Sequence, residues 1–389
     1  MEKLTKLIDE IGPSLSMCID KEAENRRLST PVFEALKKAG LYKLYLPKSL
    51  GGHEADPVTT AQLTQKVASY NTAAGWSMMV GNTASWWCNR LPENGIEEIY
   101  KDGPDTFIAG AFHPPMMATP SDDGYIINGR TPLASNVHEA RWVFVSALVM
   151  DGDRPKMINE RPVVMGVFLK ASDIQIMDTW YTIGMKATDS NDVVANGVFV
   201  PSYLTYFLDP NIQPNKYFSA AVYKYPAIGI SVVSLISPVA LAVARNAITE
   251  LKNMAAAKVP FGSAVSMKDR GSVQRKLGMA EGIVQSASAY LNHVLNKYWS
   301  KTLDREILSM EERADLLLAA THTNQSCVQV VDMMYSAAGS TAIYTKNKLS
   351  RYMCDMQVIR QHGFSNESRF ETAAQVYFGL PPDLPVLGF

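Results

Sequence analysis

Histidine is scarce in this chain, so each one can be weighed as a chemical group. There are six histidines among 389 residues, against nineteen methionines. His362 stands out because it follows the helical stretch MQVIRQ and precedes Gly363 and a small polar run. A capping histidine at the negative end of a helix dipole would explain this position. A neutral imidazole that accepts a proton from a substrate would explain it equally. Gly363 is expected just past the last helical turn, with a positive φ.

Two other histidines stand in unusual surroundings. His113 lies in AGAFHPPMMA, where it either orients a substrate or belongs to a surface turn before two prolines. His138 comes shortly after the tract LASN and is a weaker candidate for the same work. The four cysteines form no CxxC pair and have no histidine at ligand spacing, so the sequence predicts neither a metal site nor a disulfide framework.

Composition places these histidines in an ordinary globular protein. The apolar fraction is 47%, the charged fraction is 19% and the formal net charge is −1. Nucleic acid or an anionic membrane would select a basic face, so neither is expected as the main partner. The N-terminal stretch MEKLTKLIDEIG has no signal-peptide core, and we expect no later run to span a bilayer. These features favour a cytoplasmic protein.

The chain that must position these groups divides into three parts by its hydrophobic pattern. Residues 1–106 show helical periodicity and predict an all-helical domain. Residues 107–214 hold six short β-rich runs, which predict a compact antiparallel barrel or sandwich. Residues 215–389 hold three or four long helices that are apolar on more than one face. Such helices bury themselves in a bundle and often extend the burial across subunits.

Four specific motifs follow one another along this pattern. GYIINGR at 124–130 leads into LASN at 133–136, and IGMKATDSNDVVANGVFVP follows at 183–201. VPFGSAV at 259–265 and SAAGSTAIYTKNKLSRYMCD at 336–355 come later. In this order, the motifs and the three parts resemble the acyl-CoA dehydrogenase fold over nearly the whole chain. The resemblance implies an α+β protein with an N-terminal helical domain, a central β-barrel or sandwich domain and a C-terminal four-helix bundle.

The resemblance also implies a flavin in the cleft between the β domain and the bundle. Ala134, Ser135 and Asn136 would then lie along the flavin ring as backbone and hydroxyl partners of its nitrogens. A polar bulge on an edge strand is the alternative explanation of this tract. Phe112 is a further expected contact of the flavin, from the loop that the family runs over the ring.

The bundle carries the second part of the implied cofactor site. Gly339, Ser340 and Thr341 match the turn at which the family approaches the cofactor of a neighbouring subunit, although a simple helix-terminating turn would look the same. Lys258 stands where many dehydrogenases of the family have an arginine for the diphosphate, and Gly271 where they often have a glutamine. These departures fit a protein that holds its flavin loosely or prefers FMN to FAD. A site built across subunits implies a homotetramer.

The carboxylate that a dehydrogenase needs is missing from both places where the family puts it. The family removes a proton next to a thioester carbonyl with a glutamate. No acid occurs between residues 355 and 367, where His362 and Gly363 occupy the matching pair, and none occurs between residues 209 and 250. The pattern instead resembles the flavin-dependent two-component monooxygenases of this fold, which hydroxylate phenols, indoles, steroid-derived catechols and sulfur heterocycles.

This second resemblance implies a function and gives roles to residues. Such enzymes take reduced FAD or FMN from a separate NAD(P)H:flavin reductase, form a C4a-(hydro)peroxyflavin with O2 and hydroxylate an aromatic or heteroaromatic small molecule. Ser135 would hold a proton near flavin N5, His362 would serve as base or hydrogen-bond partner, and His113 is the second catalytic candidate. Trp86 and Met116 are expected in the substrate pocket beside the two histidines, unless they are only core. Other apolar candidates for that pocket are Trp76, Trp87 and Met117.

Two alternative functions stay open at the level of sequence. An acyl-CoA dehydrogenase or oxidase with a displaced base would reduce its flavin with an acyl-CoA and would need no reductase. A helical protein used only for binding or assembly would purify without flavin and would not bind reduced flavin.

Overall fold

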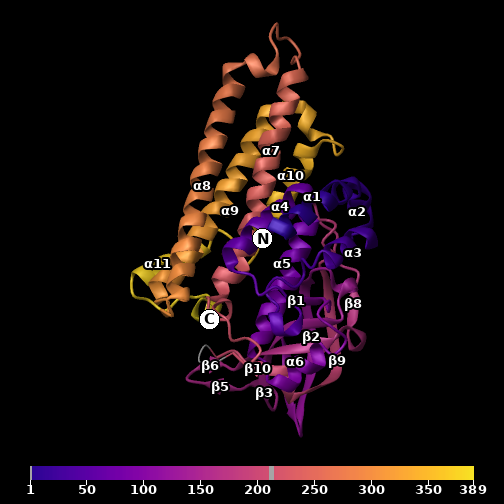
Figure 1. Ribbon diagram of the computed structural model, residues 1–389, viewed down its shortest axis with the longest axis vertical. Helices are drawn as coiled ribbons and strands as arrows, with labels where there is room; N and C mark the ends of the chain where they lie inside the picture. The colour runs from indigo at the N-terminus through magenta and orange to yellow at the C-terminus, as the bar shows by residue number, and fades with distance from the viewer. Residues whose placement is uncertain (1, 210–213) are drawn as a thin grey trace.

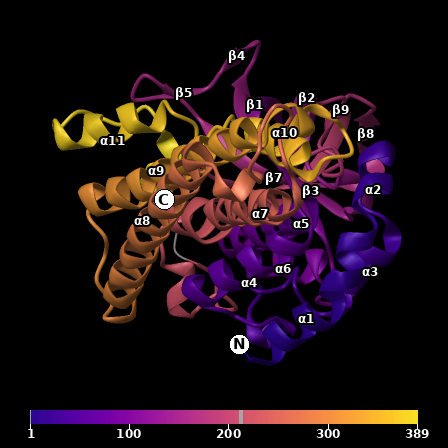
Figure 2. The same cartoon turned by 90° about the horizontal axis from the view of Figure 1, so that it is seen from above.

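A sheet lies at one end of the molecule, and a bundle of long helices rises from it (Figure 1). This computed structural model describes residues 2–209 and 214–389, apart from the side chain of Pro114. The N-terminal helices lie beside the sheet and the base of the bundle (Figures 1 and 2). They are α1 (Glu2–Met17), α2 (Ile19–Asn25), α3 (Thr30–Lys38), α4 (Pro57–Tyr70), α5 (Thr72–Trp87) and α6 (Glu93–Ile99).

The β part forms one large mixed sheet with strand order β10-β7-β3-β1-β2-β9-β8, and β4 pairs with β3. A separate two-stranded sheet pairs β5 with β6. The strands are β1 (Ile108–Ser121), β2 (Gly124–Ala134), β3 (Trp142–Asp151), β4 (Arg154–Pro155), β5 (Met157–Ile158), β6 (Arg161–Pro162), β7 (Val164–Lys170), β8 (Gln175–Met177), β9 (Asn191–Pro201) and β10 (Thr205–Phe207).

The prediction of a purely antiparallel barrel or sandwich is wrong at one strand pair. β1 and β3 run parallel, with Ile108 opposite Trp142, because β2 returns on the other side of β1 instead of lying between them. Strand β3 is buried on both faces, as its continuous run of apolar residues predicts. The α+β fold class is confirmed.

The C-terminal part is the predicted bundle. A π-helical segment, η7 (Gly229–Ile236), continues directly into α7 (Ser237–Ala257). The other helices are α8 (Gly271–Leu303), α9 (Met310–Ala338), α10 (Lys348–Ile359) and α11 (Arg369–Tyr377). Contrary to our expectation, one stretch, Gly229–Ala257, is long and apolar enough to cross a membrane. Most of it, 83% of the most apolar window, is buried inside the molecule, which identifies η7 and α7 as core helices.

Helix α5 joins the two ends of the molecule. It is apolar on nearly all sides and buried along almost its whole length, because β1 packs on one side and η7 on another. Its N-terminus is capped by Asn71, whose side chain accepts a hydrogen bond from the Ala74 N–H. The helix therefore presents fixed side chains at the junction of sheet and bundle.

Candidate active site between the sheet and the bundle

A cavity of about 940 Å³ lies where α5, the sheet and the C-terminal end of α10 meet. Its wall is mainly apolar and aromatic, with a few polar groups. Among the residues that the structure describes, no Asp or Glu lines it. The polar and aromatic side chains in the wall are Trp76, Thr83, Phe112, His113, Ser135, Trp180, Tyr181, Thr182, Thr188, Ser190, Ser231, Gln357, Gln361, His362 and Phe364.

Three hydroxyl groups form what we call the strand-side wall: Ser135, Thr188 and Ser190. The Ser135 Oγ lies 2.7 Å from the Ser190 Oγ, which lies 2.7 Å from the Thr188 Oγ1. Thr188 donates to the Met185 carbonyl at 2.9 Å, and the Trp76 indole N–H donates to Ser135 at 3.2 Å. The three hydroxyls are nearly buried, with 1 to 6% of each residue exposed. Together they form one continuous hydrogen-bonded chain.

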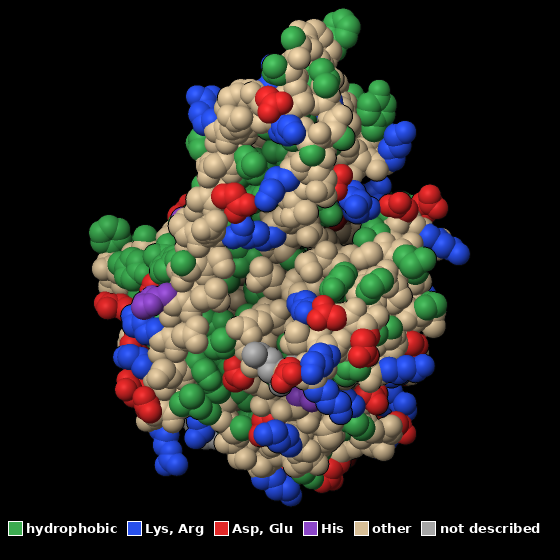
Figure 3. Space-filling view, turned by 45° about the horizontal axis from the view of Figure 1, so that its top comes forward, with side chains coloured by type: hydrophobic (Ala, Val, Ile, Leu, Met, Phe, Trp, Pro, Cys, Tyr) green, Lys and Arg blue, Asp and Glu red, His purple; other side chains and the backbone are tan. Residues whose placement is uncertain are grey.

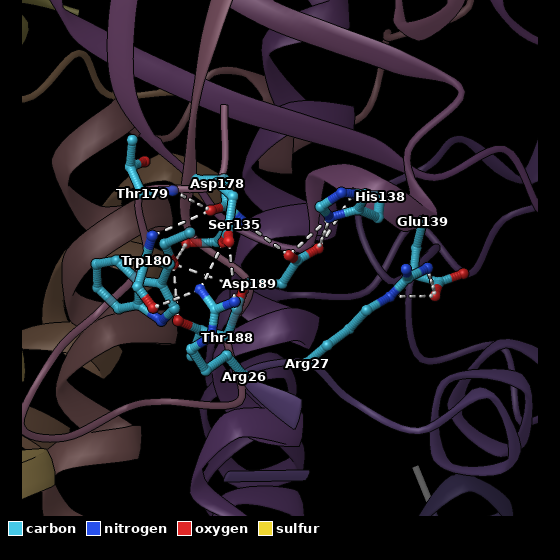
Figure 4. Close-up of polar contacts among 12 residues, drawn as sticks. Arg26, Arg27, Ser135, His138, Glu139, Asp178, Thr179, Trp180, Thr188 and Asp189 are labelled. Atoms are coloured by element: carbon cyan, nitrogen blue, oxygen red, sulfur yellow. Dashed lines mark hydrogen bonds and ion pairs between the residues drawn. The ribbon is translucent and has the colours of Figure 1, made fainter. Parts of the chain in front are cut away.

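Backbone bonds and a contact between His138 and Asp189 hold this wall together (Figure 4). The Asn136 N–H donates to the Thr188 carbonyl at 2.8 Å. His138 donates its backbone N–H to Asp189, and its Nδ1 lies 2.8 Å from the same carboxylate. Burial raises the pKa of the Asp189 carboxyl, although the nearby His138 opposes that rise. His138 does not line the cavity, and its contacts give it a positioning role.

The loop after α10 forms what we call the helix-side wall: His362, Gly363 and Phe364. The His362 ring packs edge-on against Trp76, with ring centroids 5.6 Å apart, and against Phe364 at 5.5 Å. Burial among these rings lowers the His362 pKa to about 4. The Phe364 N–H donates to His362 Nδ1 at 3.3 Å, so the neutral ring carries its proton on Nε2.

The expectation of a positive φ at Gly363 is wrong. Helix α10 ends at Ile359, and the chain makes a further turn through residues 360–362 before it reaches the glycine. Gly363 keeps a negative φ, and nothing lies within 4 Å of the place where a Cβ would stand. The glycine therefore leaves open space in the helix-side wall.

Strand β1 contributes Phe112 and His113 at an irregularity in its pairing with β3. The Phe112 ring lies between Phe144 and Phe364, with centroid distances of 5.0 and 5.7 Å. His113 is exposed at the edge of the cavity. The structure thus brings together five predicted site residues from four separate parts of the chain: Trp76, Phe112, His113, Ser135 and His362.

Several predicted site residues do not line the cavity. Trp86 is a core residue, 1% exposed, whose indole N–H donates to the Val222 carbonyl, and Met116 is equally buried. The prediction that these two contact the substrate is therefore corrected. Ala134 and Asn136 are also fully buried, and Asn136 adopts a left-handed conformation with φ +54°. The bulge in this tract lies on β2, which is an interior strand and not an edge.

Lys258 and the predicted cofactor turn at Gly339, Ser340 and Thr341 lie together elsewhere in the bundle, outside this cavity. Lys258 Nζ donates to the Ala338 carbonyl at 2.9 Å and to Thr341 Oγ1 at 2.5 Å. Gly339 ends α9 with a φ of +63°, and Ser340 follows it in a short 3-10 turn. A helix-terminating turn and a cofactor contact remain compatible with this geometry.

Sequence reasoning missed three residues of the two walls: Thr188, Ser190 and Phe364. The first two stand in ATDSND, where a cluster of hydroxyl and carboxyl residues between a loop and a strand was the available signal. Their role depends on contact with Ser135, 55 positions away, which no local pattern reveals.

The cavity fits a flat aromatic cofactor together with a small aromatic substrate. Its volume lies near the upper end of the usual range for small-molecule sites, roughly 300–1,000 Å³. Trp76, Phe112 and Phe364 supply ring faces and edges, and Gly363 permits close approach of the backbone. Ser135 and His362 supply one hydroxyl and one neutral imidazole. This set of donors and acceptors suits the polar edge of an isoalloxazine ring and a phenol or indole.

Comparison with known proteins agrees with this geometry. Residues 234–367 match the family model described as acyl-CoA dehydrogenase, C-terminal domain. An indole-3-acetate monooxygenase of Acinetobacter baumannii is 29% identical over 91% of this chain and 88% of its own length. The flavin-dependent monooxygenase oxygenase subunit HsaA of Mycobacterium tuberculosis is 26% identical over 96% of this chain and 95% of its own.

Among solved structures, XiaF from Streptomyces sp., in complex with FADH2 and glycerol, superposes with a TM-score of 0.91. The alignment covers 99% of this chain and 97% of that one, at 21% sequence identity, and it confirms the fold. The chain therefore has the acyl-CoA dehydrogenase fold, its residues 234–367 match that family's C-terminal domain, and the proteins it is similar to include flavin-dependent monooxygenases.

Proposed function

We propose that this protein is the oxygenase component of a two-component flavin-dependent monooxygenase that hydroxylates an aromatic or heteroaromatic small molecule, of phenol or indole type. The observation that carries the proposal is the composition of the cavity wall. A hydroxyl and a neutral imidazole face a space walled by aromatic rings, and no carboxylate lines it among the described residues. The names of the relatives support the same reaction class.

Reduced flavin, once bound, would activate O2 and supply the oxygen atom that an electron-rich ring takes up. The residues of this chain would hold and shield that chemistry. Ser135 would hydrogen-bond to the flavin ring from the strand-side wall, and Phe112 would pack against it. Trp76, Phe112 and Phe364 would keep water out, which protects a reactive oxygen species from wasteful loss as hydrogen peroxide.

His362 would orient the substrate from the opposite side. Because burial lowers its pKa to about 4, the imidazole is neutral at physiological pH. Nδ1 already accepts a backbone hydrogen bond, which leaves Nε2–H as a donor to a substrate oxygen. The role of hydrogen-bond partner is favoured over that of a strong base. His113 stays a second candidate at the edge of the cavity.

The proposal includes a reductase and an assembly of subunits. The relative HsaA is named an oxygenase subunit, which supports a separate reductase that delivers reduced flavin. Hydrophobic side chains are exposed at several places on the upper bundle (Figure 3), and some of them lie close in sequence to Lys258 and Gly339. They support a homotetramer with a flavin contact across subunits. They include Val259, Phe261, Ile343 and Tyr344. A soluble enzyme with a buried central helix fits a cytoplasmic location.

The test mixes the protein with photoreduced FMN or FAD and then with 18O2 in the presence of indoles, phenols and resorcinols. We expect a product that is heavier by one 18O atom, detected by mass spectrometry, and little hydrogen peroxide. Stoichiometric peroxide without a labelled product from any ring tested would contradict the proposal.

The alternative of an acyl-CoA dehydrogenase is tested with the same protein. Flavin-loaded protein is mixed anaerobically with acyl-CoA thioesters, without a reductase. Bleaching of the flavin absorbance would support the dehydrogenase. We expect none, since the described wall of the cavity has no carboxylate to remove the proton.

A further inference from the structure

The hydroxyl chain of the strand-side wall has a fixed direction. At one end stands the Trp76 indole, which can only donate, and at the other the Met185 carbonyl, which can only accept. Each hydroxyl between them has a single proton. When Thr188 donates to the Met185 carbonyl, all three contacts are hydrogen bonds only in one arrangement: Ser190 donates to Thr188, and Ser135 donates to Ser190.

This direction determines what Ser135 offers to the cavity. Its proton points to Ser190, and one lone pair accepts from Trp76. A hydroxyl oxygen has two lone pairs, so the group that Ser135 presents to a ligand is an acceptor. The three hydroxyls are nearly buried, so little water reaches them to reverse the direction of their hydrogen bonds.

We propose that Thr188 and Ser190 make the site selective for reduced over oxidised flavin, by fixing Ser135 as a hydrogen-bond acceptor. This inference rests on the proposed function. Reduced flavin carries a proton on N5 and donates there, whereas N5 of oxidised flavin is an acceptor. An acceptor that faces N5 therefore accepts a hydrogen bond from the N5–H group of the reduced ring. On the oxidised ring it meets the lone pair of N5 and is repelled. Thr188 and Ser190 act through Ser135 and are positioning residues.

The selectivity has a use in a two-component enzyme. The oxygenase must take reduced flavin from solution and release the oxidised ring after the reaction, against competition from oxidised flavin in the cell. One hydrogen bond made with one redox state and opposed in the other is worth about tenfold in relative affinity.

The experiment is an anaerobic titration of the full-length protein with oxidised and with dithionite-reduced FMN and FAD, followed by the fluorescence of the cavity tryptophans Trp76 and Trp180. Wild-type protein should bind the reduced form about tenfold more tightly. Ser190→Ala removes the acceptor of the Ser135 proton, which can then turn to oxidised N5. Its affinity for oxidised flavin should rise about fivefold, while its affinity for reduced flavin stays within about twofold.

Two further variants keep the inference falsifiable if Ser190→Ala folds poorly. Thr188→Val has a similar shape but no acceptor for Ser190, so it should also raise the affinity for oxidised flavin. Ser231→Ala removes a hydroxyl that lines the same cavity but does not belong to the hydroxyl chain. It should leave the ratio of the affinities for reduced and oxidised flavin unchanged. A gain in oxidised-flavin affinity cannot come from general damage, because damage weakens the binding of both forms.

The possible outcomes separate the two proposals. An unchanged ratio in Ser190→Ala and Thr188→Val, or equal weakening of both redox forms, overturns the inference and leaves the monooxygenase proposal intact. If wild-type protein binds neither redox form, the proposed function itself fails, and the inference fails with it.

Discussion

The two walls of the cavity hold their polar groups in opposite ways. On the strand-side wall, Ser135, Thr188 and Ser190 form a chain with oxygen–oxygen distances of 2.7 to 2.9 Å, from an indole donor to a backbone acceptor. On the helix-side wall, the His362 ring accepts one backbone hydrogen bond at 3.3 Å and packs edge-on against the rings of Trp76 and Phe364.

This difference shows how one cavity can bind both a flavin cofactor and an aromatic substrate. The strand-side wall is preorganised, because each hydroxyl is committed to a neighbour, and it can present a fixed acceptor at no cost of reorganisation. The helix-side wall excludes water, keeps its imidazole neutral and leaves Nε2–H and the space beside Gly363 for the substrate. Cofactor selectivity and substrate recognition are thus assigned to different walls.

The walls are joined through Trp76 and also by a close backbone contact. Gly184, from the loop that leads into the strand-side wall, packs against the backbone of α10 beside Cys354. Next to it, the Met185 N–H donates to Asp355 Oδ1 at 2.6 Å. This joint sets the spacing of the walls, and the largest effects should come from altering it.

Gly184→Ala should therefore have the largest effect. A Cβ at this position would stand 2.1 Å from the Cys354 carbonyl oxygen and 2.5 Å from the Asp355 nitrogen, and backbone cannot move away as a side chain can. We expect a loss of about 3 kcal/mol in the free energy of unfolding, measured by urea denaturation. The matched control is Gly282→Ala, in an exposed position of α8 with open space around it, which should be neutral or stabilising. Equal stability of the two variants would refute a tight joint.

Asp355→Asn tests the charge at the same joint and should have the next largest effect. Burial raises the pKa of Asp355 to about 6, from an ordinary value of 3.8. Between about pH 4 and pH 6 the folded protein binds more protons at Asp355 than the unfolded chain does. The contribution of Asp355 to the free energy of unfolding therefore falls as the pH rises through this range. Asparagine keeps the acceptor for Met185 without the charge. At pH 8 the variant should be more stable than wild type by about 2 kcal/mol, and near pH 4 the two should agree.

The control for this charge is Asp20→Asn. Asp20 is highly exposed and pairs with Arg351 at 3.0 Å, and solvent screens this pair, so Asp20→Asn should leave the free energy of unfolding at pH 8 nearly unchanged. If Asp355→Asn is less stable than wild type at pH 8, the carboxylate contributes favourable interactions that outweigh its burial.

His362→Ala should lower the yield of hydroxylated product about tenfold without weakening the binding of reduced flavin, because the helix-side wall is assigned to the substrate. His293→Ala, an exposed histidine of α8, should retain the full yield. With a pKa of about 4, the His362 imidazole is neutral from about pH 5.5 upward. A plot of the wild-type rate against pH should therefore show no inflection near pH 6.5 that comes from this residue. Loss of flavin binding in His362→Ala would instead place this residue on the cofactor side.

Much of the fold was accessible from the sequence, because its signals are local. Helical periodicity, turn-separated β runs and the order of the motifs predict the α+β class and the bundle. The parallel pairing of β1 with β3 was not accessible, since it depends on where β2 returns. Strand order is a long-range property, and the period of each strand is the same in either arrangement.

The site divides in the same way. Ser135 and His362 were found because their motifs and the missing carboxylate point to them, and the structure places both in one cavity. Thr188 and Ser190 were missed, because a hydroxyl chain exists only after loops distant in sequence meet. The turn at Gly363 was misjudged since α10 is followed by an additional turn. The assignments of Lys258, Gly339, Ser340 and Thr341 stay predictions.

The smallest effect should come from the rim, where both walls give way to solvent. Arg26, the residue that follows α2, donates to Asp178 at 2.5 and 3.2 Å (Figure 4). Its guanidinium lies 3.9 Å from the centre of the Tyr181 ring. These contacts hold the loop that includes Tyr181 at the edge of the cavity, but solvent screens them. Arg26→Ala should raise KM for the aromatic substrate about twofold, leave kcat unchanged and lose this effect at high salt. Arg130→Ala, which removes a surface ion pair with Asp192 outside the cavity wall, should change neither constant. A tenfold change in kcat for Arg26→Ala would show that the rim positions the reacting groups, and the division of labour between the two walls would then have to include a third element.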